Sequence, residues 1–234
     1  SPAKLHKDKN FGTSNGGSIN SGVFWPNAGY VSDPALSSQN LADAAKKHGA
    51  KFRMGAEVIE IIQENGSVKG VKIRTGEKIY APVLINIAGP GSSYINKLAD
   101  VEREMTRVTR PLRQEVVHVP SPQGFDFEKN GIIVSDSDIA LYCRPEQGNN
   151  ILIGSEDPDC DEHKWVEDDV EYDDNFSDQW TTQVMRYAQR VPTLGIPSSA
   201  RGLVDLYDVS ADLIPTYDKS SLASFYMACG TSGN

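Results

Sequence analysis

The fold is decided by residues 83–91, which read VLINIAGPG. Five of the first six residues are apolar and several are β-branched, a pattern that predicts a strand buried on both faces. The run ends in a turn whose backbone can approach a ligand closely, formed by Ala88, Gly89, Pro90 and Gly91. Residues 92–98 then have the pattern of a helix. A buried strand, a glycine turn and a helix N-terminus together are typical of a place where a phosphate or a flavin ring sits.

The same turn resembles a dinucleotide-binding fingerprint only in part. Residues 89–94 read GPGSSY, so Tyr94 stands where the third glycine of GxGxxG belongs. The strand before the turn also follows a β-meander instead of the start of a βαβ unit. The motif alone is therefore weak support for NAD, and a strand-to-helix turn without a ligand remains an alternative.

A second glycine-rich turn follows another short apolar run. Residues 225–228 read FYMA and predict a strand, and after Cys229 the chain continues with Gly230, Thr231, Ser232 and Gly233. Small residues at such a place let backbone N–H groups face an anion or a polar ring edge.

Composition limits the classes of function. The chain has 234 residues and a net charge of −9, which argues against a nucleic-acid partner. Of its 32 acidic residues, 12 lie within residues 156–178, which we interpret as a solvated surface loop. That segment lacks the spacing of an EF-hand loop, and Cys160 with His163 offers only two soft ligands, so no metal is expected.

The expected location is a reducing one. No apolar run approaches the roughly 20 residues of a membrane span, and the first 17 residues lack the apolar core of a signal peptide. The three cysteines are far apart and form no CxxC pair, so the cytoplasm or an organelle matrix is expected.

The order of elements predicts an α+β fold. Asp33 followed by Pro34 starts a helix that stops at Gly49, and a hairpin turn at Asn65 and Gly66 joins strands at 57–63 and 67–74. The middle of the chain predicts a mostly antiparallel sheet and one helix, with strands at 114–119, 131–135, 139–143 and 150–154 and the helix at 176–191. We expect a loop-rich segment over 1–28, one unit formed by 29–100 and 200–234, and another formed by 101–199.

Several motifs in one order resemble a known family. They read GYVSDP at 29–34, HGA at 48–50, NIAGP at 86–90, RGL at 201–203 and ACGTSG at 228–233. This set resembles the FAD-dependent oxidoreductases of the D-amino-acid oxidase superfamily, on the branch of glycine, sarcosine and dimethylglycine oxidases and dehydrogenases. The resemblance covers about residues 15–234 and implies an FAD-binding Rossmann-like domain interleaved with a substrate domain.

The resemblance implies a role for particular residues. Val58 matches the position whose backbone meets the adenine end of FAD, and residues 88–91 match the turn near the pyrophosphate and flavin. Residues 230–233 match the segment whose amides face the pyrimidine edge of the ring. Asp205 stands where relatives with covalent flavin have a cysteine, so FAD is expected to bind without a covalent link.

The resemblance also implies that the chain is a piece of a larger enzyme. Such enzymes begin with a GxGxxG unit that has no match here, so we expect the incomplete FAD-binding domain to bind FAD poorly and to be inactive alone. The whole enzyme would oxidise a C–N bond of an amino acid or amine by hydride transfer to flavin, then pass electrons to oxygen or an electron-acceptor protein. Its oligomeric state stays open.

The substrate site is less well defined. Tyr142 and Arg144 are candidates on a strand of the middle sheet, where Arg144 could hold a substrate carboxylate. The competing interpretation, which we favour, is that Arg144 ends a surface strand before a turn. Two other functions remain open: a non-catalytic assembly subunit on the same scaffold, and a flavoenzyme acting on a hydroxy acid or glycerol phosphate.

Overall fold

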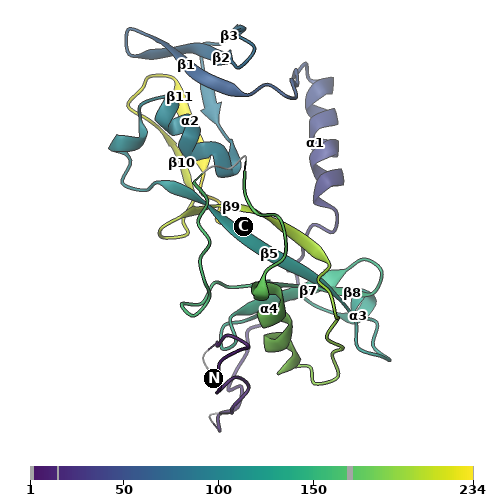
Figure 1. Ribbon diagram of the computed structural model, residues 1–234. Coiled ribbons are helices and arrows are strands. Elements are labelled where there is room, and N and C mark those ends of the chain that lie inside the picture. Colours follow the sequence, from purple (N-terminus) through teal and green to yellow (C-terminus); the bar gives the residue numbers. More distant parts are fainter. Residues whose placement is uncertain (1–2, 15, 168–170, 234) are drawn as a thin grey trace. The chain divides into compact units, whose positions relative to one another are not determined.

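The computed structural model describes residues 3–14, 16–167 and 171–233. The expected mixed α and β fold is confirmed (Figure 1). The helices are α1 (Pro34–Lys47), α2 (Ser92–Leu98), α3 (Phe127–Asn130) and α4 (Asp178–Ala188), with 3-10 turns η1 (Gly89–Gly91) and η2 (Glu102–Glu104). The strands are β1 (Val58–Glu64), β2 (Ser67–Ile73), β3 (Lys78–Tyr80), β4 (Leu84–Asn86), β5 (Thr109–Pro120), β6 (Val134–Asp136), β7 (Leu141–Glu146), β8 (Asn150–Ser155), β9 (Gly202–Ser210), β10 (Thr216–Lys219) and β11 (Phe225–Cys229).

The chain forms two compact units. Unit 1 contains residues 1–49, 115–163 and 174–205, and unit 2 contains residues 50–114, 164–173 and 206–234. Two of the five passages of the chain between the units fall within the long strands β5 and β9. The predicted domain boundaries at 28, 100 and 200 stay a prediction, although unit 2 does combine a central segment with the C-terminal one.

Unit 2 is built on two small sheets. One is the antiparallel meander β1–β2–β3, in which Asn65 and Gly66 both adopt positive φ at the predicted hairpin turn. The other has the order β10–β11–β4, with β11 parallel to β4 and antiparallel to β10. Helix α2 contacts both β1 and β4, and one core connects these elements, formed by Ile61, Val68, Ala99, Val101, Leu222, Phe225, Met227 and Cys229.

The expectation that the strand at 83–88 is buried on both faces is wrong. Strand β4 covers only Leu84–Asn86, and Ile85 and Ile87 are 56% and 70% exposed. Asn86 is buried on the opposite face, toward α2. Among the described residues, the elements that pack on β4 cover the face of Asn86 and leave the face of Ile85 and Ile87 exposed.

Unit 1 combines an antiparallel sheet with α4. The sheet of five strands has the order β6–β7–β8–β5–β9, and its core comes from β5, β7, β8 and α4. Glu115 on β5 is buried and holds the N-terminus of α4: its carboxylate accepts from Ser177 N at 2.9 Å, Ser177 Oγ at 2.7 Å and Trp180 N at 3.1 Å. A carboxylate at this end also favours the helix dipole.

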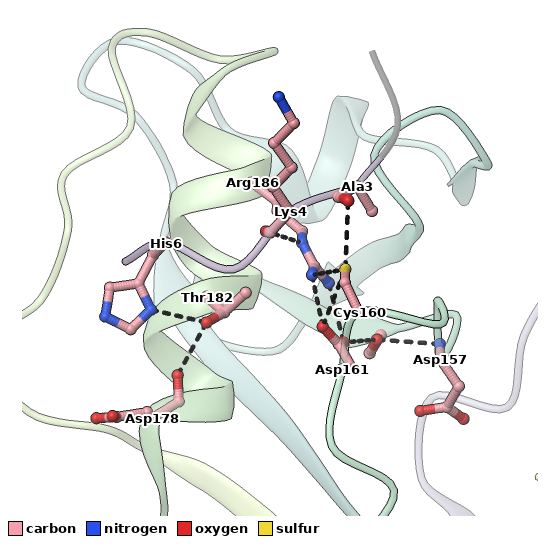
Figure 2. A network of polar contacts seen from close by, with 10 residues as sticks. Ala3, Lys4, His6, Asp157, Cys160, Asp161, Asp178, Thr182 and Arg186 are labelled. Atoms are coloured by element: carbon pink, nitrogen blue, oxygen red, sulfur yellow. Dashed lines mark hydrogen bonds and ion pairs between the residues drawn. The ribbon is translucent and has the colours of Figure 1, made fainter. Parts of the chain in front are cut away.

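A buried ion pair joins α4 to the acidic segment and to the N-terminal segment (Figure 2). Arg186 is fully buried, and its Nη1 donates to Asp161 Oδ2 at 2.9 Å while its Nη2 donates to Oδ1 at 2.5 Å. Its Nε donates to the Lys4 carbonyl at 3.0 Å, and His6 Nδ1 lies 2.8 Å from Thr182 Oγ1. Asp161 is buried, so the prediction of a wholly solvated acidic loop is wrong at this residue.

Within the described residues, every helix is too short or too polar to cross a bilayer. The same residues bring no three His, Cys, Asp or Glu side chains together in the way a metal ion requires.

Candidate functional site

Both glycine turns lie in unit 2 and leave the same sheet edge. Strands β11 and β4 run parallel with Phe225 opposite Leu84, Tyr226 opposite Ile85 and Met227 opposite Asn86. Because parallel strands end at the same edge, the turns at 88–91 and 230–233 emerge beside one another. The carboxyl edge of a parallel pair is where α/β folds bind their ligands.

Asn86 fixes the first turn from below. Its side-chain Nδ2 donates to the Ser92 carbonyl at 2.9 Å and to Asn96 Oδ1 at 2.8 Å, and its side-chain Oδ1 accepts from Ala88 N at 3.2 Å. Gly89 has a φ of +55°, and a Cβ built on it would meet no atom within 4 Å. The turn is therefore rigid at its base and open above Gly89.

Asp208 fixes the second turn. Its carboxylate Oδ2 accepts from Gly230 N at 2.5 Å, and its backbone carbonyl accepts from Ser232 N at 2.9 Å. Asp208 is 5% exposed, and this burial raises the pKa of its carboxyl, while the Gly230 amide and the nearby Thr109 hydroxyl lower that pKa. Burial and the neighbouring Asp208 charge likewise raise the pKa of the Cys229 thiol.

Two backbone N–H groups of the second turn make no hydrogen bond to the described residues. Among the described residues, neither Thr231 N nor Gly233 N has a hydrogen-bond acceptor, and both residues are exposed. Gly233 has a φ of +86°, and a Cβ there would come within 2.4 Å of the Tyr207 ring. Tyr207 therefore packs beneath the turn and leaves the amides free.

An open hollow of about 490 Å³ adjoins the first turn at Pro90 and Tyr94. The cations on its rim each have an acidic partner: Arg110 lies 3.4 Å from Glu167 and 4.7 Å above the Trp165 ring, Arg103 pairs with Asp100, and Lys97 Nζ lies 3.9 Å from Glu102 Oε2. This hollow therefore lacks the free positive charge that a phosphate site needs.

The remaining predicted residues lie apart from the turns. Val58 begins β1, in the meander sheet, where its side chain packs against the core of unit 2. Tyr142 and Arg144 share one face of β7 in unit 1. Tyr142 covers Gly154 of β8, whose Cβ would lie 2.4 Å from the Tyr142 hydroxyl.

Arg144 is not a free cation. Its Nη1 lies 2.9 Å from Glu146 Oε2 and donates to the Pro145 carbonyl at 3.0 Å, and its guanidinium stacks 4.9 Å from the Tyr30 ring. Both charged side chains are more than four-fifths buried. A substrate carboxylate would have to displace Glu146.

The comparisons with known proteins place the chain in a family. The model of the DAO family, FAD dependent oxidoreductase, matches residues 4–234. The chain belongs to the FAD-dependent oxidoreductase family. Its cofactor is FAD, and the resemblance to the FAD-dependent oxidoreductases is confirmed, while the predicted branch of glycine, sarcosine and dimethylglycine enzymes stays a prediction.

Curated relatives match part of the chain, and two of them represent the kinds of protein found. One subunit of the anaerobic glycerol-3-phosphate dehydrogenase of Escherichia coli (strain K12) is 38% identical over 82 residues, which are 33% of this chain and 15% of that protein. Digeranylgeranylglycerophospholipid reductase of Haloferax volcanii is 30% identical over 103 residues, which are 43% of this chain and 25% of that protein.

Solved structures share the fold. L-proline dehydrogenase from P. horikoshii superposes with a TM-score of 0.64 at 20% identity, over 86% of this chain and 50% of that one. Glycine oxidase from Bacillus cereus ATCC 14579 gives 0.61 at 19% identity, over 82% and 49%. The chain thus spans about half the length of these structures.

The residues present fit FAD. The uncommitted Thr231 and Gly233 amides are donors suited to the acceptor atoms on the pyrimidine edge of the ring, and Gly89 leaves open space at the same sheet edge. Sequence reasoning found both turns but missed Asp208 and Asn86. The signal for both was a polar residue within an apolar strand, at 86 in VLINI and at 208 in LYDVS.

Proposed function

We propose that this chain is part of an FAD-dependent oxidoreductase that oxidises a C–N bond of an amino acid or amine. The observation that carries the proposal is the pair of glycine turns at one sheet edge, with the Thr231 and Gly233 amides uncommitted. When bound, FAD accepts a hydride from the substrate carbon. The two amides would stabilise the negative charge that then builds on the pyrimidine edge.

The choice of amine chemistry has separate support. Structures that share the fold include a proline dehydrogenase, glycine oxidases and an iminodiacetate oxidase, all named for amine substrates. In unit 1 we propose Arg144 as the group that holds a substrate carboxylate, after Glu146 moves away. Tyr142 would border the same face of β7.

A second substrate class also has support. The partial match to the Escherichia coli glycerol-3-phosphate dehydrogenase favours an alcohol next to a phosphate as the reductant. That chemistry would oxidise a C–O bond on the same scaffold and would use the same glycine turns. The two proposals therefore differ in the substrate and agree on the flavin.

Anaerobic mixing of the whole flavoprotein with candidate substrates separates these possibilities. Bleaching of the flavin absorbance by glycine, sarcosine, dimethylglycine or proline, and none by glycerol 3-phosphate, is the expected result. The reverse pattern would replace the amine proposal by the glycerol phosphate one. A whole protein without any flavin spectrum would favour the non-catalytic assembly subunit.

The 234-residue chain alone gives a further check. We expect it to bind FAD poorly, because the matched structures are about twice as long and the first turn offers few donors by itself. A purified chain of these 234 residues that is yellow and fully loaded with FAD would contradict this expectation.

A further inference from the structure

The second glycine turn is held by β9, chiefly by Asp208, while Ser210 N of the same strand donates to Ser232 Oγ at 3.4 Å. Asp208 uses its side chain and its backbone for this purpose: Oδ2 accepts from Gly230 N at 2.5 Å, and its carbonyl accepts from Ser232 N at 2.9 Å. One further hydrogen bond lies within the turn itself: Ser232 Oγ donates to the Gly230 carbonyl at 3.2 Å. Each bond engages the first or the third residue of the turn.

The alternation of engaged and free amides follows from this anchor. Gly230 is buried and Ser232 half-buried, whereas Thr231 and Gly233 are exposed and, among the described residues, their N–H groups have no acceptor. Positive φ values of 73° at Gly230, 55° at Ser232 and 86° at Gly233 make the alternation possible. Turns with such positive φ values can leave successive backbone N–H groups available to an anion or a polar ring edge.

We propose that Asp208 is the positioning residue of this turn: by holding the Gly230 and Ser232 amides, it aims the Thr231 and Gly233 amides at the acceptor edge of the flavin. This inference rests on the proposed function. It assigns to Asp208 a role that packing alone does not require, since an apolar side chain could fill the same space.

The burial of Asp208 supports a positioning role. A carboxylate that is 5% exposed is costly, and only Oδ2 has a hydrogen bond of good geometry. Oδ1 and the Thr109 hydroxyl are both buried and, within the described part of the chain, lack such a bond, although they lie close to each other. Burying a charged carboxylate here costs more free energy than burying an apolar side chain. The hydrogen bond from this carboxylate to Gly230 N gives a reason for its presence.

The negative charge has a second consequence. A carboxylate behind the turn opposes the negative charge that develops on a reduced flavin in front of it. Replacing Asp208 by Asn keeps an acceptor for the Gly230 amide and removes the charge. We therefore expect the Asp208→Asn holoprotein to have a higher flavin reduction potential, an effect that a purely structural role does not produce.

Amide hydrogen exchange on the 234-residue chain tests the anchor without flavin. We expect slow exchange at Gly230 and Ser232 and fast exchange at Thr231 and Gly233. Asp208→Ala should speed the Gly230 amide by at least about tenfold, because a hydrogen bond to a charged group is lost. The exposed Asp218→Ala on β10 is the matched control and should change none of the four amides.

The whole flavoprotein tests the role toward FAD. Asp208→Ala should weaken FAD binding by about tenfold or more, while Asp208→Asn and Asp218→Ala should bind within about threefold of the unchanged protein. Addition of FAD should shift the Thr231 and Gly233 amide resonances most. Equal FAD affinity in Asp208→Ala, or an unchanged potential in Asp208→Asn, would overturn the proposal.

The two levels of inference fail in different ways. A wrong proposed function would show as a whole protein that takes up no FAD, with the four amides still alternating in the chain. If the role assigned to Asp208 is wrong, the whole protein would bind FAD normally, and substitutions of Asp208 would change neither the FAD affinity nor the flavin reduction potential. Uniform exchange across the four amides would refute the anchor itself.

Discussion

The buried ion pair between Arg186 and Asp161 allows a quantitative prediction about unit 1. The perturbation is Arg186→Met, which keeps an unbranched apolar side chain and removes the guanidinium and its charge. Arg186 and Asp161 have side chains that are 0% and 4% exposed, so the carboxylate of Asp161 would be left buried with Ser155 Oγ at 2.8 Å as its closest remaining side-chain partner. The Lys4 carbonyl would lose its bond to Arg186 Nε as well.

The magnitude follows from these contacts. Removing one partner of a buried ion pair costs about 3–5 kcal/mol. The lost bond to the Lys4 carbonyl adds about 1 kcal/mol. The expected loss in the free energy of unfolding is therefore about 4–6 kcal/mol, comparable with the total stability of many domains, about 5–15 kcal/mol.

The assay is urea unfolding followed by a probe inside unit 1. The chain has three tryptophans, and replacing Trp25 and Trp165 by Phe leaves Trp180, which packs against the core of unit 1 from α4. The control is Lys7→Ala, because Lys7 and Asp178 form an ion pair with side chains 67% and 70% exposed. That variant should lose less than about 1 kcal/mol.

A double-mutant cycle gives the result that would refute the reasoning. If the pair is the cause, Asp161→Asn combined with Arg186→Met should be less destabilised than the sum of the two single variants, by at least about 1.5 kcal/mol. Additive losses, or a loss below about 1 kcal/mol in Arg186→Met, would show that burial of this pair does not control the stability of unit 1.

Three further predictions concern single positions. Gly70→Ala should destabilise the meander by about 2 kcal/mol or more in urea unfolding, because the new Cβ would lie 2.1 Å from the Ile79 carbonyl oxygen. The control Gly76→Ala, whose Cβ would meet nothing within 4 Å, should lose about 1 kcal/mol. Equal losses in the two variants would contradict the steric cause. Burial raises the folded-state pKa of Asp208 above its ordinary 3.8, so the stability that protonated Asp208 contributes is present below pH 3.8 and is lost as the pH rises through the raised pKa. Over this pH window the urea midpoint of Asp208→Asn should rise relative to that of the unchanged chain. Parallel pH profiles of the two midpoints would contradict this prediction. In the whole flavoprotein, Arg144→Ala should raise KM for a carboxylate-bearing amine by about tenfold or more and leave KM for an amine without a carboxylate unchanged, and an equal change for both would remove Arg144 from the substrate site.

Local chemistry allowed the sequence to predict much of the fold. Asp33 and Pro34 define the start of α1, and the side chain of Asp33 accepts from Leu36 N at 2.8 Å. Asn65 and Gly66 define the hairpin between β1 and β2 in the same way. Each of these signals acts within four residues, so no distant part of the chain is needed to interpret it.

The features that the sequence did not predict depend on distant partners. Strand β10 lacks an alternating pattern and forms because it pairs with β11, Thr216 lying opposite Cys229. The 83–88 run has the composition of a strand buried on both faces, yet its burial depends on which neighbours cover it, and the described residues cover one face of β4. Burial of Asp161 likewise depends on Arg186, 25 residues further along the chain.

Asp208 and Glu115 are two buried acids whose carboxylates bind backbone N–H groups of a distant segment. Each lies on a long strand and is buried, and each carboxylate accepts at least one backbone N–H group from a segment more than 20 residues further along the chain. Glu115 caps the helix α4, whereas Asp208 holds a turn without regular structure. A helix N-terminus has several N–H groups to offer, so Glu115 satisfies both of its oxygens. In the site proposed above, the glycine turn keeps two amides for the flavin and offers one to the carboxylate, which would account for the single hydrogen bond of Asp208.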